Sequence, residues 1–282
     1  MHPDHTPARY EGRVLPRPGE EVQDQGLAFD LGTVLGRRRV LRALGLGAAA
    51  VGLAACGTST APARTSSTSA GEIPEETAGP YPGDGSNGTN VLTESGIVRS
   101  DIRSSFGTGS ATAGGVPMTL ELTITDIAGG NVPFAGVAVY VWHCDREGRY
   151  SLYSSGVENE NYLRGVQVTD AAGKVRFTSI VPACYSGRWP HIHFEVYPNQ
   201  AGITDANNAI ATSQVALPQD VCTAVYAQPG YQQSVTNLAR ITLASDTVFR
   251  DDNAAHQLAT VTGDPTAGYT VALTAGVDTT TR

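Results

Sequence analysis

The chain has 282 residues and a formal net charge of −8, with 40% hydrophobic and 16% charged residues. Its first 55 residues hold seven arginines and six acidic residues, a net charge of +1, so the remainder carries −9. A domain this acidic lacks the basic face that phosphate binding requires, which argues against a nucleic-acid partner.

The first 55 residues have the features of an export signal rather than those of a domain. Three consecutive arginines at 37–39 precede an apolar run at 43–55, as in twin-arginine signals. The run is shorter than the ~20 apolar residues that a membrane-spanning helix needs. It ends at Cys56 behind small residues, which is typical of lipoprotein processing; the alternative is an ordinary cleavage site beside an accidental cysteine. We expect residues 1–55 to be a signal region and Cys56 to be lipidated.

The next segment has the composition of a tether. Residues 56–73 are rich in Ser, Thr, Ala and Pro, as flexible linkers are. Residues 74–282 have the size of one domain. The sequence therefore predicts an exported lipoprotein, anchored through its lipid on the periplasmic side of a membrane or at the cell surface.

The domain region is a succession of short strands separated by turn signals. Apolar and polar residues alternate at 118–125 and 137–141. Turn residues follow at 129–131, 145–148 and 170–173, and one short helix is expected near 220–227. This predicts an all-β fold, an antiparallel β-sandwich with long loops around its functional site and little helix. The predicted strands are 119–126, 136–144, 163–169, 174–180, 191–197, 241–242, 257–263 and 268–274.

One predicted strand carries two histidines on one face. His191 and His193 are two residues apart, so both imidazoles point to the same side of the sheet while Ile192 points to the other. By itself such a pair is either a set of metal ligands or two half-exposed histidines. Two tyrosines decide between these: Tyr185, in Pro-Ala-Cys-Tyr, and Tyr150, in Trp-His-Cys-Asp-Arg-Glu-Gly-Arg-Tyr.

Together these segments resemble the intradiol ring-cleavage dioxygenases, the family of catechol 1,2-dioxygenases and protocatechuate 3,4-dioxygenases. The family pattern has a Trp-His-x-x-x-x-Gly-x-Tyr segment, a Pro-x-x-Tyr segment and an Arg-x-x-His-x-His segment. All three occur here in that order. The segment at 77–81, Thr-Ala-Gly-Pro-Tyr, is similar to the motif that precedes the family's strands. The resemblance covers residues 74–270 and implies the family's β-sandwich.

The resemblance implies a mononuclear, non-haem Fe(III) centre. Tyr150 matches the tyrosinate that stays bound, Tyr185 the axial tyrosinate that leaves when substrate binds, and His191 and His193 the two imidazole ligands. Phenolate oxygens are hard anionic donors that suit Fe(III). Two phenolates and one hydroxide also make the buried site neutral. The other tyrosines lack such neighbours, so we interpret them, together with His143, as structural.

The implied reaction is cleavage of an aromatic diol between its two hydroxyl groups by O2. The catechol gives up both protons as it binds, with Tyr185 as one base, and the product is a muconate-type diacid. The metal is a Lewis acid and a template. Arg188 matches the family's arginine near the substrate, where its charge would stabilise developing negative charge; the alternative is a surface ion pair. Tyr81 and Gln214 are further candidates for the substrate pocket.

Three cysteines remain beyond the expected lipidation site. Because an exported chain meets an oxidising compartment, one disulfide is an option. We expect Cys184 to pair with Cys222, since both flank loops near the predicted site, whereas Cys144 ends a core strand. Three buried thiols are the alternative.

Two rival functions also fit parts of the sequence. A non-catalytic β-sandwich lipoprotein that binds a ligand or a cell-wall polymer would not need Tyr150 or Tyr185. A zinc or copper protein would use His191 and His193 and would show no tyrosinate colour. The stretch from Tyr185 to His191 is shorter than in protocatechuate enzymes, and the helical N-terminal region through which catechol enzymes dimerise is missing. The sequence therefore leaves the substrate and the subunit number open.

Overall fold

The structure, a computed structural model, describes residues 9–10, 13–14 and 71–280. Near the N-terminus β1 (Arg9–Tyr10) pairs with β2 (Arg13–Val14). The predicted signal peptide, the expected lipidation site Cys56 and most of the expected linker lie outside the described residues. In the part of the chain that the structure describes, no helix has the length and apolar character needed to cross a bilayer.

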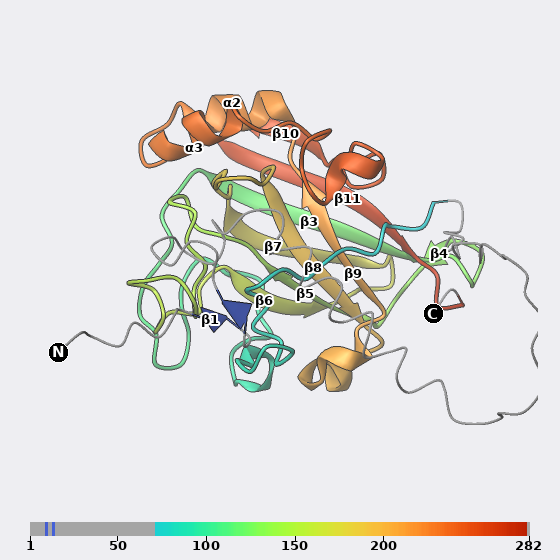
Figure 1. Cartoon of the computed structure of the whole chain (residues 1–282). Helices are drawn as coiled ribbons and strands as arrows, with labels where there is room; N and C mark the ends of the chain where they lie inside the picture. The colour runs from blue at the N-terminus through green and yellow to red at the C-terminus, as the bar shows by residue number, and fades with distance from the viewer. Residues whose placement is uncertain (1–8, 11–12, 15–70, 281–282) are drawn as a thin grey trace, which may run out of the picture.

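Two β-sheets form the body of the molecule (Figure 1). The first sheet has the order β10 (Thr260–Asp264), β11 (Gly268–Val277), β3 (Pro117–Asp126) and β4 (Val132–Pro133), with β7 (Lys174–Ile180) also paired to β3. The second sheet has the order β6 (Arg164–Val168), β5 (Ala138–Trp142), β8 (His191–Tyr197) and β9 (Ala211–Ala216). Two short helices, α2 (Gln219–Tyr226) and α3 (Gln232–Leu238), follow β9. Within the described residues, 3-10 helices are at Val91–Thr93, Gln200–Thr204, Ala206–Asn208 and Phe249–Asp251.

The main core lies between the sheets. Every second residue of β3 is buried, so Leu120 and Leu122 face Ile192 and Phe194 of β8 in one apolar cluster. Burying one such side chain stabilises the fold by about 2 kcal/mol. The opposite face of β8, which carries the two histidines, packs against loops instead, so the alternation that builds the core also directs His191 and His193 away from it.

The predicted antiparallel β-sandwich is confirmed, with one parallel pair inside it. All strand pairs in the two sheets are antiparallel except β11 with β3, where Tyr269 lies opposite Met118 and Val277 opposite Asp126. The strands at 174–180 and 191–197 and the helix after Pro218 agree with the sequence-based prediction.

The predicted strand at 241–242 is wrong. Ile241 packs beside the apolar cluster that contains Trp189 and Phe249, and Thr242 begins a turn that its carbonyl closes by accepting the Asp246 amide at 2.9 Å. Residues 241–242 therefore lead into a turn and do not pair with a strand.

The last residues of the expected linker pack against the domain. The Ile73 amide donates to the Gly276 carbonyl at 2.9 Å, and the Ile73 side chain is part of the main core. Glu72 also forms a parallel bridge with Gly276. Residues 72 and 73 are therefore joined to the sheet.

The expected disulfide between Cys184 and Cys222 is absent: Cys144, Cys184 and Cys222 are free, buried thiols. The Cys184 thiol donates to the Arg188 carbonyl at 3.5 Å, while Cys222 lies on the buried face of α2 in the main core. Burial raises the pKa of the Cys184 thiol to about 12. These thiols are therefore protonated packing groups, as in the alternative interpretation.

Candidate metal centre

The site lies where β8 begins, between three loops. His191 and His193 are both at least 97% buried on the same face of β8. Trp142 of β5 is the register partner of His193, and their rings stack at 4.8 Å with an interplanar angle of 8°. Neighbouring strands thus fix the plane of one imidazole.

Tyr150 and Tyr185 come from loops that hydrogen bonds hold in place. Before Tyr150, the buried Asp145 carboxylate accepts the Arg149 amide at 2.9 Å and the Tyr162 hydroxyl at 2.9 Å. Beyond Tyr185, the chain turns at Gly187, whose φ of +81° favours glycine. These turns direct both phenols toward the start of β8.

The four predicted ligands converge. The Nε2 atoms of His191 and His193 are 3.1 Å apart, and the Tyr185 hydroxyl is 3.1 Å from His191 Nε2. The Tyr150 ring centroid lies 5.9 Å from that of Tyr185 and 6.2 Å from that of His193. Residues from three separate segments therefore meet around one point.

The histidine nitrogens are prepared to donate lone pairs. His191 Nδ1 is 2.5 Å from the Trp189 carbonyl oxygen, a contact that requires the proton on Nδ1 and leaves a lone pair on Nε2. Burial, and then the nearby Arg188 cation, lower the pKa of His191 well below its usual value. Burial and the neighbouring His191 do the same to the pKa of His193. Both rings are neutral at physiological pH, which is the form that binds a metal.

Unpartnered polar atoms are concentrated here. Six buried side-chain atoms in the described residues lack a hydrogen-bond partner, and three of them belong to Tyr150 (Oη), His193 (Nδ1) and Trp142 (Nε1). By contrast, other buried tyrosines such as Tyr226 and Tyr231 donate their hydroxyl protons to backbone carbonyls. An unsatisfied buried hydroxyl lowers the free energy of unfolding by about 1–3 kcal/mol. The position of Tyr150 Oη therefore fits contact with a metal ion rather than with a protein group.

These donors fit a single iron ion. Two nitrogens bound side by side to one ion at about 2.1 Å lie about 3 Å apart, close to the observed separation. Burial and the neighbouring Tyr185 raise the pKa of Tyr150 well above 10, so this phenol ionises only where a cation binds its oxygen. No group of three His, Cys, Asp or Glu residues within the described ranges could hold a metal; here the two phenols bring the number of converging donor side chains to four. Imidazole with hard anionic oxygen suits Fe(III).

A pocket that is partly open to solvent adjoins these ligands. Tyr81, one of the candidates for the substrate pocket, lines it, and its ring centroid lies 5.2 Å from that of Tyr150. Gly79, with φ +72°, lets the backbone pass close to His193, since a Cβ there would be 3.4 Å from the imidazole. The residues that line the pocket are Thr77, Gly79, Pro80, Tyr81, Trp142, Tyr150, Tyr185, Arg188, His193, Thr247 and Val248.

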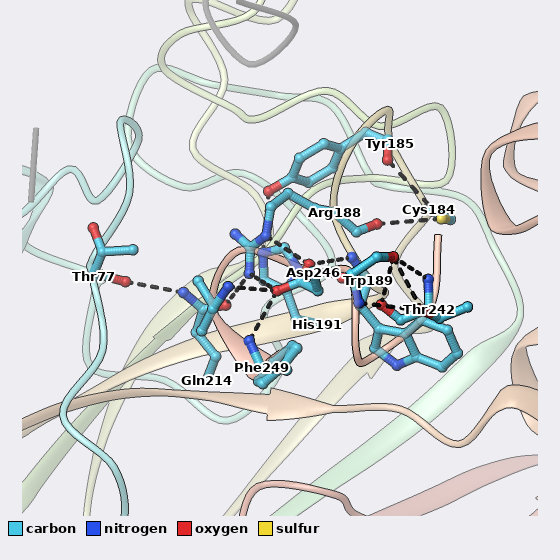
Figure 2. Close-up of polar contacts among 12 residues, drawn as sticks. Thr77, Cys184, Tyr185, Arg188, Trp189, His191, Gln214, Thr242, Asp246 and Phe249 are labelled. Carbon is cyan, nitrogen blue, oxygen red and sulfur yellow. Dashed lines mark hydrogen bonds and ion pairs between the residues drawn. The ribbon is translucent and has the colours of Figure 1, made fainter. Parts of the chain in front are cut away.

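Arg188 is a buried residue of this pocket, not part of a surface ion pair (Figure 2). Its Nε donates to Asp246 at 2.9 Å and its Nη2 donates to Gln214 Oε1 at 2.6 Å. Burial alone would lower the pKa of Arg188, but Asp246 and the nearby phenols raise it above its ordinary value, so the cation is permanent. Gln214 is not among the lining residues; its amide nitrogen donates to the Thr77 carbonyl at 3.0 Å, so it supports Arg188 from behind.

Other predicted and missed residues can now be placed. His143 is structural, as expected: its nitrogens contact the Cys144 carbonyl and the Ser179 hydroxyl, each at 2.8 Å. The sequence interpretation missed Asp246 and the pocket wall at Thr247 and Val248. Nothing in the local sequence marks them, since the contact from Arg188 to Asp246 spans 58 positions.

Comparison with known proteins identifies the family of this chain and supports its fold. A family model described as Dioxygenase matches residues 101–252, more than half of the chain. An intradiol ring-cleavage dioxygenase from Tetranychus urticae is 22% identical with a TM-score of 0.59, covering 74% of this chain and 95% of that one. A second dioxygenase crystal structure is 22% identical with a TM-score of 0.58, covering 74% and 94%. The dioxygenase domain of a carbohydrate-binding fusion from Streptomyces sp. SirexAA-E is 22% identical with a TM-score of 0.44, covering 73% and 98%. The chain belongs to the intradiol ring-cleavage dioxygenase family.

Proposed function

We propose that this protein is a non-haem Fe(III) dioxygenase that uses O2 to open a catechol-type ring between its two hydroxyl groups, giving a muconate-type diacid. The observation that carries the proposal is the convergence of Tyr150, Tyr185, His191 and His193 beside a pocket, with the Tyr150 hydroxyl buried and unpartnered. A binding protein without a metal would have no use for that costly hydroxyl.

Each ligand has support that fixes its orientation. His191 and His193 would bind iron through their Nε2 atoms, held by the Trp189 carbonyl and by the Trp142 ring. Tyr150 would supply a permanent phenolate from its buried position. Fe(III) bound there would act as a Lewis acid and as a template for the diol.

Tyr185 and Arg188 have the roles that their surroundings allow. Tyr185 is half-buried and borders the pocket, so its oxygen can take a proton from an arriving diol and move away. Arg188 lines the same pocket as a fixed cation, where it would stabilise negative charge on the ring during attack by O2. Tyr81 and Val248 also line the pocket.

We also propose that the protein is exported and held at a membrane by a lipid on Cys56. The support is the sequence alone: the arginines at 37–39, the apolar run at 43–55 and the cysteine behind small residues.

Visible absorption spectroscopy of the chain purified in air tests the proposed centre. A broad tyrosinate-to-Fe(III) band is expected with about one iron per chain, because two phenolates bind one ion. Catechol added without O2 should shift the band to longer wavelength, and O2 should then be consumed one molecule per ring. Tyr150→Phe should remove most of the colour, whereas Tyr226→Phe, a buried tyrosine with a satisfied hydroxyl, should keep it. A protein that stays colourless and inactive after iron loading would show that the proposal is wrong.

A further inference from the structure

The Asp246 carboxylate, beside the pocket, accepts hydrogen bonds from four residues. It is 0% exposed, and its Oδ2 accepts Arg188 Nε at 2.9 Å and the Trp189 amide at 2.7 Å. Its Oδ1 accepts the amides of Val248 at 2.8 Å and Phe249 at 3.1 Å. Figure 2 shows Asp246 between the loop of Arg188 and the turn of Phe249. One side chain therefore connects the two segments that build one side of the pocket.

This arrangement sets the orientation of Arg188. Asp246 and Gln214 together engage Nε and Nη2, so the guanidinium plane is fixed from two directions. Because charge-assisted bonds of this kind are strong and directional, Arg188 cannot turn toward a new partner without breaking them. The same carboxylate holds the backbone of Val248, which lines the pocket next to Arg188.

The arrangement also cancels charge. Apart from the proposed iron ligands, Arg188 is the one lining residue of the described pocket with a formal charge, and it is paired with a fully buried anion. The pair contributes no net charge to the pocket. A carboxylate on a substrate ring would compete with Asp246 for the same cation and would be repelled by it, an arrangement that discriminates by like charge. The net charge of −9 on residues 56–282 opposes anionic ligands at longer range as well.

We propose that Asp246 is the positioning residue that fixes and neutralises Arg188, and that the pocket therefore selects catechols whose ring carries no anionic substituent. The inference rests on the proposed function, since it names the substrate class of that site. Asp246 itself does not touch the substrate, because its oxygens are occupied by Arg188 and by backbone amides.

The test compares 4-methylcatechol with 3,4-dihydroxybenzoate on the iron-loaded full chain. Two quantities are measured for each: kcat/KM by O2 uptake, and Kd by calorimetric titration without O2, which needs no turnover. The wild type is expected to favour 4-methylcatechol at least about tenfold in both, the factor that a binding difference of about 1.4 kcal/mol gives.

Asp246→Asn should change that ratio, because Arg188 regains an uncompensated charge. The carboxylated substrate should gain at least about tenfold relative to the uncharged one, while Asp246→Glu should return the ratio toward that of the wild type. The matched control is Asp170→Asn. Asp170 also accepts backbone amides in a turn, those of Ala172 and Lys174. This turn follows the end of β6 that lies away from the pocket, whereas Arg164 begins β6 opposite Trp142. It should leave the ratio unchanged.

Several outcomes would overturn the inference. A wild type that uses 3,4-dihydroxybenzoate as well as 4-methylcatechol would contradict the substrate class. An Asp246→Asn protein that loses the same factor on both substrates would show a merely structural role for Asp246. If Asp246→Asn does not fold, Thr247→Lys is the second variant to measure. Thr247 is a half-buried residue of the pocket wall, so a new cation there should raise the relative affinity for the carboxylated ring. An unchanged affinity ratio would count against the inference. Absence of turnover and of binding for every catechol would instead remove the proposed function.

Discussion

The buried hydroxyl of Tyr150 is expected to lower the stability of the metal-free fold. Its ring is buried between Tyr81 and Tyr185, but its hydroxyl makes no hydrogen bond within the described residues. A protein selected for stability alone would use phenylalanine here, because an unsatisfied buried hydroxyl is costly. Tyr226 has the opposite character, since its hydroxyl donates to the Pro182 carbonyl at 3.1 Å.

Two substitutions in the metal-free protein should therefore differ in sign. Tyr150→Phe should leave the free energy of unfolding unchanged or raise it by about 1 kcal/mol, because it removes an unpaired group. Tyr226→Phe should lower it by about 1 kcal/mol, because it removes a hydrogen bond and leaves a buried carbonyl unpaired. Urea denaturation followed by circular dichroism measures both. A clear loss of stability in Tyr150→Phe would mean that its hydroxyl has a structural partner.

At the residue scale, the sequence predicts those parts of the site that have a fixed local spacing. His191 and His193 are separated by one strand period, and Tyr150 and Tyr185 stand in short motifs, so all four could be named in advance. Asp246 could not, because its partner Arg188 is 58 positions away in sequence and, although a motif marks Arg188, no pattern marks Asp246. Long-range charge pairing depends on the folded arrangement of the loops.

Among the elements, the segment at 74–77 covers the edge of the second sheet. The Glu76 amide donates to the Thr212 carbonyl at 2.7 Å, and Ser213 and Gln214 donate from β9 to the carbonyls of Pro74 and Thr77. The edge strand is thereby protected by a segment that also forms part of the pocket. This segment carries a half-buried carboxyl at Glu76.

Glu76 should make stability depend on pH. Burial, and then Asp251, raise its pKa from 4.5 to about 8. Between pH 4.5 and about pH 8 the folded state holds a proton on Glu76 that the unfolded state has released. The free energy of unfolding therefore falls as pH rises through this window. The slope is smaller than about 1.4 kcal/mol per pH unit, the largest value that one titrating group can give. Glu76→Gln should flatten this slope and stabilise the protein at pH 8 by about 1 kcal/mol. Urea melts at pH 5, 6, 7 and 8 check it, with the exposed Glu94→Gln as control; parallel slopes for wild type and Glu76→Gln would contradict it.

Strand prediction succeeded where composition and periodicity agree. β3 alternates strictly and β8 is rich in aromatic and β-branched residues, so both were predicted. β9 was missed, because Ala-Thr-Ser-Gln-Val-Ala is made largely of small and polar residues and is buried at every position. β9 is buried because Ala211 and Val215 belong to the main core and the segment at 74–77 bonds to the strand, and the local sequence does not reveal that covering.

For the molecule as a whole, the anchor that we propose has a direct test. Cys56→Ala in the full chain should move the protein from the detergent phase to the aqueous phase in a cloud-point partition of producing cells, because it removes the site of acylation. The buried thiol variant Cys222→Ala is the matched control and should partition like the wild type. A Cys56→Ala protein that remains in the detergent phase would require another means of membrane attachment.

The parallel pairing of β11 with β3 also constrains the order of events during synthesis. β3 is the central strand of its sheet, yet its partner β11 is made after all the other strands of that sheet; Figure 1 shows the two, green and red, side by side. Until Tyr269 emerges, one edge of β3 stays open, with Met118, Leu120 and Leu122 ready to pair with another chain. A nascent chain of this protein is therefore expected to need shielding from the synthesis of β3 until that of β11, and a chain truncated before β11 is expected to aggregate rather than to fold in part.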